Sequence, residues 1–293
     1  MKQTHLVTGR FAPSPSGRMH LGNIYAAFMS WLSARRQGGR WILRIEDLDP
    51  QRSKPEYARL IEDDLRWLGL DWDEGGIADG YCQSLRGGLY ADALARLEEL
   101  GLVYACRCTR ADIMATQAPH QSDGRVIYAG TCRPHHCPPY ARPEGPGTRR
   151  LYVPYGESVD FTDRNFGQQH VVLAAECGDF IVRRADGAWA YQLAVVVDDA
   201  LMGVTEVVRG ADLLLSTAQQ IYLYRLLGLT PPDWAHLPLI TNEAGIRLSK
   251  RDASLSMEAI RASGATPDEV IGRVAALAGL IPEPAPVSLH SLV

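Results

Sequence analysis

Cysteine is scarce in this chain, long apolar runs are missing, and neither sign of charge dominates. Six cysteines among 293 residues are too few and too unevenly spread for a disulfide framework. No run comes near the roughly 20 apolar residues of a membrane span, and the first residues lack the apolar stretch of a secretory signal. With 30 basic and 34 acidic side chains the net charge is −4, so nucleic-acid contact depends on local basic patches. We therefore expect a cytoplasmic globular protein without membrane contact.

The cysteines that are present are clustered. Cys106, Cys108 and Cys132 provide three thiolates on predicted loops, which tetrahedral zinc accepts if a fourth ligand completes the site. The sequence offers four candidates for that ligand: Tyr128, His135, His136 and Cys137. The alternative to a zinc site is that these cysteines are metal-free cytosolic thiols. Cys82 and Cys177 are isolated, and we expect both to be core residues.

Alternating β-rich and amphipathic segments predict an α/β fold with a parallel sheet covered by helices. The main expected strands are residues 4–7, 40–47, 189–199 and 205–209. The main expected helices are residues 24–36, 53–68, 86–100 and 212–227. The stretches "SKPE" at 53–56 and "TPDE" at 266–269 are typical of capping boxes, with proline at the first helical position.

The regular pattern stops between Cys106 and Arg149, where six of the 18 prolines lie. We expect an inserted module there, followed by short strand-like runs. Arginines in and beside the module form a local cluster of basic residues that suits phosphate contact: Arg107, Arg110, Arg133, Arg142, Arg149 and Arg150.

The stretch "RFAPSPSGRMHLGN" at 10–23 joins a predicted strand to a predicted helix. The first turn of a helix at the carboxyl edge of a parallel sheet has unpaired N–H groups that attract phosphate, and glycine allows close backbone approach. His20 stands at the helix start and is placed to donate a hydrogen bond to a phosphate, although a lone histidine there is usually only a polar surface residue. Arg10 and Arg209 end predicted strands, and their guanidinium groups match carboxylates.

Two short motifs carry a family resemblance. "HLGN" at 20–23 resembles the HIGH signature of class I aminoacyl-tRNA synthetases, and "RLSKR" at 247–251 resembles their KMSKS loop. They occur in the right order, about 225 residues apart. "RFAPSPSG", "LRIEDLD", "VVRGADLL" and "RLSKRDAS" are similar to the glutamyl branch, and the similarity runs from Arg10 to about Ser254. Asn23 replaces the final histidine of HIGH, and its amide can still donate.

This resemblance implies a Rossmann-like parallel sheet with an inserted zinc-containing subdomain and a short helical C-terminal region. The implied boundaries are residues 1–105 and 189–240 for the two halves of the catalytic domain, 106–188 for the insert, and 241–293 for the KMSKS-type loop and C-terminal helices. It also implies that Tyr128 is the fourth zinc ligand, as in short glutamyl-type paralogues.

The resemblance further implies the roles of individual residues in ATP-dependent formation of an aminoacyl adenylate. The implied catalytic residues are His20, Asn23 and Lys250, and ATP, with Mg²⁺, is expected to contact His20, Gly22, Asn23 and Lys250. The implied glutamate pocket consists of Arg10, Phe11, Ala12, Pro13, Ser14, Glu46, Tyr191 and Arg209. Glu46 suits the ammonium group of the substrate; the alternative is a structural pair with Arg44 or Arg10.

Only 42 residues follow Arg251, which we expect to be too few for an anticodon-reading domain. That length is similar to short paralogues of the glutamyl enzymes, which activate L-glutamate without tRNA and attach it to the queuosine base at the wobble position of tRNA(Asp). The expected partners are thus ATP, L-glutamate and queuosine-bearing tRNA(Asp), with the protein a monomer. Three alternatives stay open: a truncated glutamyl-tRNA synthetase that charges the 3′ end of tRNA(Glu), a nucleotidyltransferase of the same superfamily, and a non-catalytic binding module.

Overall fold

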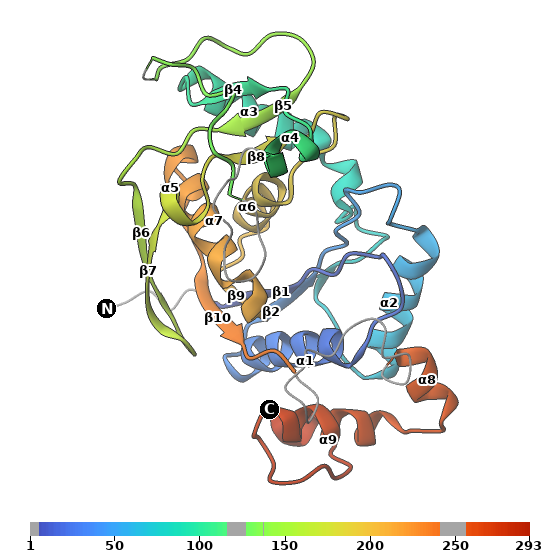
Figure 1. The fold of residues 1–293 in the computed structure, drawn as a ribbon. Coiled ribbons are helices and arrows are strands. Elements are labelled where there is room, and N and C mark those ends of the chain that lie inside the picture. Colours follow the sequence, from blue (N-terminus) through green and yellow to red (C-terminus); the bar gives the residue numbers. More distant parts are fainter. Residues whose placement is uncertain (1–5, 116–126, 137, 241–255) are drawn as a thin grey trace. The chain divides into compact units, whose positions relative to one another are not determined.

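The computed structural model describes residues 6–115, 127–136, 138–240 and 256–293 (Figure 1). Its contacts divide the chain into two compact units. Unit 1 comprises Met1–Leu85, Gly203–Asp212 and Pro232–Val293, and unit 2 comprises Arg86–Met202 and Leu213–Pro231. Each unit is therefore built from segments that are distant in the sequence.

Unit 1 contains parallel strands, as the alternating pattern predicted. Strand β1 (Thr8–Phe11) pairs with β2 (Arg40–Leu43), which pairs with β3 (Glu74–Gly75). Strand β9 (Glu206–Gly210) pairs in parallel with β10 (Asp233–Leu237). Thr205, just before β9, exchanges two hydrogen bonds of 2.9 Å with Thr8 of β1, which places the two parallel groups beside each other.

Helices of unit 1 enclose its core. They are α1 (Leu21–Arg36), α2 (Pro55–Trp67), α8 (Met257–Ala262) and α9 (Pro267–Leu277). Helix α1 packs against β1, β2 and β9, and its apolar side chains join a core that includes the fully buried Trp41 and Phe28. Among the described residues, no helix combines the length and the apolar character needed to cross a bilayer.

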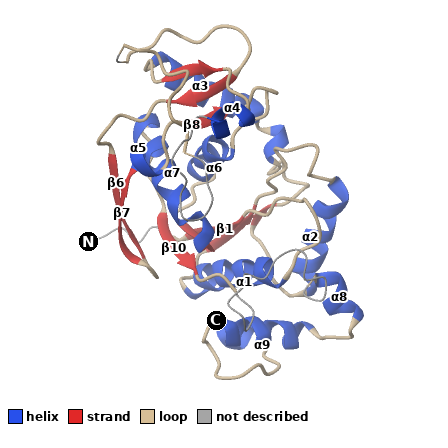
Figure 2. Ribbon diagram, in the orientation of Figure 1, coloured by secondary structure: helices blue, strands red, loops and turns tan. Residues whose placement is uncertain are grey.

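Unit 2 contains a three-stranded antiparallel sheet and a β-hairpin (Figure 2). The sheet has the order β4 (Val103–Cys106), β5 (Thr148–Leu151), β8 (Phe180–Arg183), and the hairpin pairs β6 (Ser158–Asp163) with β7 (Gly167–Val172). The helices are α3 (Gly87–Glu99), α4 (Arg110–Ala115), α5 (Leu173–Glu176), α6 (Tyr191–Leu201) and α7 (Leu214–Leu227).

Three sequence-based expectations about elements were wrong. Residues 191–201 form helix α6 and not a central strand, because an apolar run buried on several sides does not reveal its period. The first described strand is Thr8–Phe11: residues 6 and 7 of the expected strand 4–7 are not part of it, and residues 4 and 5 lie outside the described residues. Helix α2 begins at Pro55 as expected, but its N-cap Lys54 has no side-chain capping bond, so the predicted Ser53 box does not form. The box of Thr266 and Glu269 at the start of α9 is confirmed.

Candidate functional site

His20 is the N-cap of helix α1, and its ring belongs to the capping hydrogen bonds. Its Nδ1 accepts from the backbone N–H of Gly22 at 3.1 Å, and the amide oxygen of Asn23 accepts from the His20 N–H at 3.1 Å. Because Nδ1 is an acceptor, the proton of the neutral ring lies on Nε2. The histidine therefore presents an N–H donor at the positive end of the helix. Asn23 has a cap-forming role that the sequence comparison with HIGH did not reveal.

The segment after β1 runs beside the end of β2. The N–H of Arg44 donates to the Phe11 carbonyl at 3.0 Å, and the N–H of Glu46 donates to the Pro13 carbonyl at 2.9 Å. These bonds hold Glu46 next to the segment that contains Ala12 and Ser14. The Glu46 carboxylate also accepts from the fully buried Arg44 at 3.1 Å, so the structural pairing considered from the sequence is present.

Arg209 is held by two aromatic residues of the neighbouring strand. It is 5% exposed, its Nε donates to Nε2 of the buried His236 at 3.1 Å, and its guanidinium carbon lies 4.9 Å from the Trp234 ring centre. His236 stands opposite Arg209 in the parallel register. Arg10, on β1, is likewise buried, with 4% exposure. Sequence reasoning missed His236, and only the pairing of β9 with β10 identifies it.

A buried carboxylate connects the region of His20 with helix α8. Asp64 of α2 is fully buried, and its Oδ1 accepts from Arg18 at 3.0 Å and from Arg261 of α8 at 2.9 Å. The backbone supplies a second connection, since the Met257 N–H donates to the Met19 carbonyl at 2.9 Å. These contacts fix the start of α8 against the residues that precede His20.

The other predicted site residues lie in varied surroundings. The Phe11 ring stacks on Trp41 in the core, with centroids 6.2 Å apart. Pro13 is buried, Ala12 half-buried and Ser14 exposed. Tyr191 is the half-buried first residue of α6 and belongs to unit 2. Lys250, with the rest of "RLSKR", lies outside the described residues.

The structure brings three of the clustered cysteines together in unit 2. The sulfur atoms of Cys106, Cys108 and Cys132 lie within 4.8 Å of one another, and Cys108 and Cys132 are 3.4 Å apart. The hydroxyl of Tyr128 is 3.4 Å from the Cys106 sulfur and 3.9 Å from the Cys108 sulfur. Tetrahedral zinc, with Zn–S bonds of about 2.3 Å, separates its sulfur ligands by about 3.8 Å. The spacing therefore fits zinc with three thiolates and Tyr128.

The other candidates for the fourth ligand differ in position. His135 and His136 do not join the group among the described residues; His136 instead lies edge-on to Tyr140, with ring centres 5.5 Å apart. Cys137 is outside the described residues. Cys82 is buried as expected, whereas Cys177 is half-buried and lines a pocket, so its assignment to the core was wrong.

The thiols of the cluster differ in acidity. Burial opposes ionisation of Cys132, but hydrogen bonds from the Arg107 backbone and from Cys108 lower the pKa of Cys132 to about 7. Burial and the bond with Cys132 raise the pKa of Cys108 to about 11. Burial also raises the pKa of Tyr128. A bound cation would have to displace the phenol proton for Tyr128 to act as a phenolate ligand.

Several arginines that were predicted to contact phosphate instead bind carboxylates of unit 2 or are buried in it. Arg133 binds the buried Asp179 carboxylate through Nε at 2.8 Å and through a terminal nitrogen at 2.6 Å. Arg142 donates to Glu98 at 2.8 Å. Arg150 is only 5% exposed. The cluster of basic residues open to phosphate contact is therefore smaller than the sequence indicated.

Comparison with known proteins identifies related sequences. The family model described as "tRNA synthetases class I (E and Q), catalytic domain" matches residues 6–285. The glutamyl-Q tRNA(Asp) synthetase of Symbiobacterium thermophilum is 50% identical over 298 residues, which cover 98% of this chain and 91% of the relative. The protein of the same name from Geobacter sulfurreducens is 51% identical over 87% of this chain and 79% of its own length.

Solved structures with a similar fold include a glutamate tRNA ligase from Elizabethkingia meningosepticum in complex with its amino acid. Its TM-score is 0.81 and its sequence identity 29%, and the match covers 98% of this chain but 64% of that chain. A methionyl-tRNA synthetase from Mycobacterium tuberculosis, 11% identical with a TM-score of 0.53, shares the fold alone. This chain spans less than two thirds of the ligase structure that it matches.

Proposed function

We propose a function from one established premise: this chain belongs to the catalytic-domain family of the class I tRNA synthetases for Glu and Gln. The prediction made from "HLGN" and "RLSKR" is thereby confirmed. We propose that the protein activates L-glutamate with ATP, without tRNA, and transfers it to the queuosine base at the wobble position of tRNA(Asp).

The observation that carries this proposal is that the chain matches relatives that all have the same name, over nearly the whole length of each. The relative from Symbiobacterium thermophilum is 50% identical and 91% covered, and that from Nitratidesulfovibrio vulgaris is 49% identical and 88% covered. Identity to the longer glutamate tRNA ligase is 29%. The alternative of charging the 3′ end of tRNA(Glu) is not favoured by these names.

Activation joins a glutamate carboxylate oxygen to the α-phosphorus of ATP and breaks the bond to pyrophosphate. The start of α1 supplies N–H groups and a partial positive charge for the phosphates, and His20 Nε2–H would be a further donor. Gly22 allows close approach, and Asn23 holds the cap that orients His20. Lys250 would stabilise the leaving pyrophosphate. Mg²⁺ bound with ATP would neutralise further phosphate charge.

Glutamate has two carboxylates and one ammonium group, and buried residues of unit 1 match this pattern. Arg10 and Arg209 provide guanidinium groups, and the strand partner His236 fixes the orientation of Arg209. Glu46 would accept from the ammonium group while it stays bonded to Arg44. The backbone around Ala12, Pro13 and Ser14 is held beside Glu46, and Phe11, whose ring is in the core, would contribute through its backbone. The family resemblance also assigns Tyr191, the first residue of α6 in unit 2, to glutamate binding.

Zinc would be held in unit 2 by Cys106, Cys108, Cys132 and Tyr128. With four protein ligands the site is closed, so the metal would stabilise structure and would not take part in the reaction. In the transfer step, a hydroxyl oxygen of the queuosine ring bonds to the glutamyl carbonyl carbon, the bond from that carbon to the phosphate oxygen of AMP breaks, and AMP leaves as the hydroxyl proton is released. A folded insert is expected to serve RNA binding.

The direct test is exchange of labelled pyrophosphate into ATP without RNA. We expect exchange with L-glutamate and at most background exchange with L-glutamine, L-aspartate or no amino acid. A protein that exchanges only when tRNA is present would contradict tRNA-independent activation. A protein that shows no exchange under either condition would contradict the synthetase assignment for this chain.

A further inference from the structure

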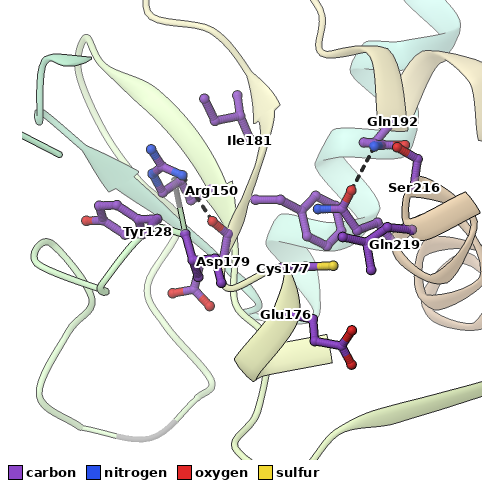
Figure 3. Close-up of a pocket in the computed structure, with 12 residues that line it drawn as sticks. Tyr128, Arg150, Glu176, Cys177, Asp179, Ile181, Gln192, Ser216 and Gln219 are labelled. Atoms are coloured by element: carbon purple, nitrogen blue, oxygen red, sulfur yellow. Dashed lines mark hydrogen bonds between the residues drawn. The ribbon is translucent and has the colours of Figure 1, made fainter. Parts of the chain in front are cut away.

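A pocket of about 330 Å³ opens in unit 2, and none of its lining residues belongs to the groups assigned to ATP or glutamate, although the lining residue Gln192 directly follows Tyr191 (Figure 3). Its walls come from β5, β8 and helices α5, α6 and α7, together with Tyr128. This volume is in the range of pockets that hold small organic ligands. The described part of unit 2 thus contains a ligand-sized space that the proposed function has not used.

One wall presents a chain of side-chain amides. Gln220 donates to the Gln192 oxygen at 2.9 Å, and Gln192 donates to the Gln219 oxygen at 2.8 Å. Figure 3 shows the second of these bonds at the edge of the pocket. Whichever way the amides are oriented, one polar group of Gln219 is left over for a ligand. Ser216, one turn earlier on α7, is 5% exposed and also lines the pocket.

The opposite wall combines a ring, a guanidinium group and apolar side chains. The Arg150 guanidinium carbon lies 3.8 Å from the Tyr128 ring centre, and one terminal nitrogen donates to the Asp179 carbonyl at 3.0 Å. The buried Nε of Arg150 has no hydrogen-bond partner among the described residues. Phe180 and Leu215 supply apolar surface. Flat apolar and stacked walls favour a planar ring system.

The charges of the described lining nearly balance. Arg150 is its one lining cation and Glu176 is acidic, while the buried Asp179 carboxylate is already paired with Arg133. A lining with no excess of positive charge suits a neutral ring, or one that bears an ammonium substituent, better than a phosphate.

We infer that this pocket binds a nucleobase that is unstacked from the anticodon loop of the RNA substrate. The inference rests on the proposed function, which supplies the RNA. Unpaired RNA bases are recognised by hydrogen bonds to their edges and by contact with their faces, and the amide, hydroxyl and ring groups on the two walls provide both. The carboxylate of Glu176, whose Oε1 also accepts from the Val172 N–H at 2.7 Å, would favour a base with a cationic amine, which queuosine carries and guanosine lacks.

The test uses the full chain and a fluorescent stem-loop with the tRNA(Asp) anticodon sequence and queuosine. Gln219→Met and the pocket-filling Ser216→Leu are each expected to raise the Kd about tenfold, because each removes a hydrogen bond to the base or blocks its entry. Gln169→Met, at a half-buried position of β7, is the matched control for the half-buried Gln219 and should leave the Kd unchanged. Pyrophosphate exchange without RNA should stay at the wild-type rate in all three, which also verifies folding.

A second arm identifies the base. We replace each loop nucleotide in turn by an abasic site, and expect one position to weaken wild-type binding about tenfold but Gln219→Met by less than about twofold. Glu176→Gln should reduce the preference for queuosine over guanosine. Unchanged binding by the pocket variants, or equal abasic losses in wild type and Gln219→Met at every position, would overturn the inference. Loss of exchange in the wild type would instead contradict the proposed function, while the Kd values remain measurable.

Discussion

At the scale of single residues, the proposed glutamate pocket depends on one strand pairing. Arg209 lies opposite His236 because β9 and β10 are parallel and in register, and the imidazole accepts the Arg209 Nε–H. A buried guanidinium group needs such partners, since an unsatisfied buried donor is costly. His236 is therefore a positioning residue for Arg209 and is not proposed to contact the substrate.

Arg209→Lys tests the carboxylate-binding role. An ammonium group lacks the planar fork that makes two parallel hydrogen bonds, so the KM for glutamate in pyrophosphate exchange should rise about 10- to 100-fold. The half-exposed Arg225, which pairs with Glu157 at 3.4 Å, gives the control Arg225→Lys, and that variant should keep the wild-type KM. An unchanged KM in Arg209→Lys would remove Arg209 from the pocket.

His236→Leu tests positioning. It removes the acceptor for Arg209, and we expect the KM for glutamate to rise about tenfold with a smaller change in kcat. His236→Gln restores an acceptor and should recover most of the loss. A purely structural role predicts something different: both variants would lower Tm, and the KM would stay the same.

Sequence reasoning was strong for local features and weak for partners across the fold. The position of His20 and Asn23 at the start of a helix was predictable because a helix start and a four-residue motif are contiguous in the sequence. His236 was missed because its importance comes from a strand register between residues 27 positions apart. Whether Arg10, Glu46 and Tyr191 bind glutamate together stays a prediction.

At the scale of elements, helix α6 shows why an apolar run is ambiguous. Val195, Val196 and Val197 are consecutive, β-branched and buried, which favoured a strand from propensity alone. The helix packs against α3, α7 and β8, so its apolar residues are covered on several sides and show no single face. By contrast, the Thr266–Glu269 box was predictable because capping is a local interaction.

The connection of α2 with α8 was not predictable either, since Asp64 and Arg261 are 197 residues apart. Burial raises the pKa of Asp64, while hydrogen bonds from Arg261 and Arg18 oppose that shift. The carboxylate thus depends on both arginines. Together with the Met257 N–H bond to the Met19 carbonyl and the bridge between His20 and Ser256, this contact holds the start of α8 near His20.

Asp64→Asn tests this anchor. Breaking a buried ion pair should lower the free energy of unfolding by about 3 kcal/mol. The neighbouring Asp63 contacts the same Arg261 at 2.5 Å but is 58% exposed, so Asp63→Asn should cost less than about 1 kcal/mol. Urea unfolding of both variants measures the difference. Equal losses for the two would show that burial of Asp64 adds nothing.

At the scale of the whole molecule, the two units carry different parts of the account. Unit 1 has the proposed ATP and glutamate groups except Tyr191, and unit 2 has Tyr191, the cysteine cluster and the pocket. The sequence indicated an insert from the loss of periodicity after Cys106. The domain boundaries implied by the resemblance stay predictions. Each compact unit combines segments that are distant in the sequence, so the two units do not test those boundaries one by one.

Zinc content is a property of the whole purified chain. We expect one equivalent of zinc per chain, lost in Cys132→Ser, and a Tm that falls on chelation because metal binding contributes to folding. Tyr128→Phe should keep three thiolates and bind zinc about 10- to 100-fold more weakly in a competition with a chromogenic chelator. Less than half an equivalent of zinc in the wild type would favour metal-free thiols.

The central claim is that glutamate activated by this chain reaches a base of the anticodon loop. The most direct measurement gives the protein ATP, labelled glutamate and tRNA(Asp) with or without queuosine, alongside tRNA(Glu), and then removes the anticodon loop by nuclease digestion. The account predicts label only on queuosine-bearing tRNA(Asp), leaving with the anticodon fragment. Label that stays on the 3′ end, or that appears on tRNA(Glu), would contradict it.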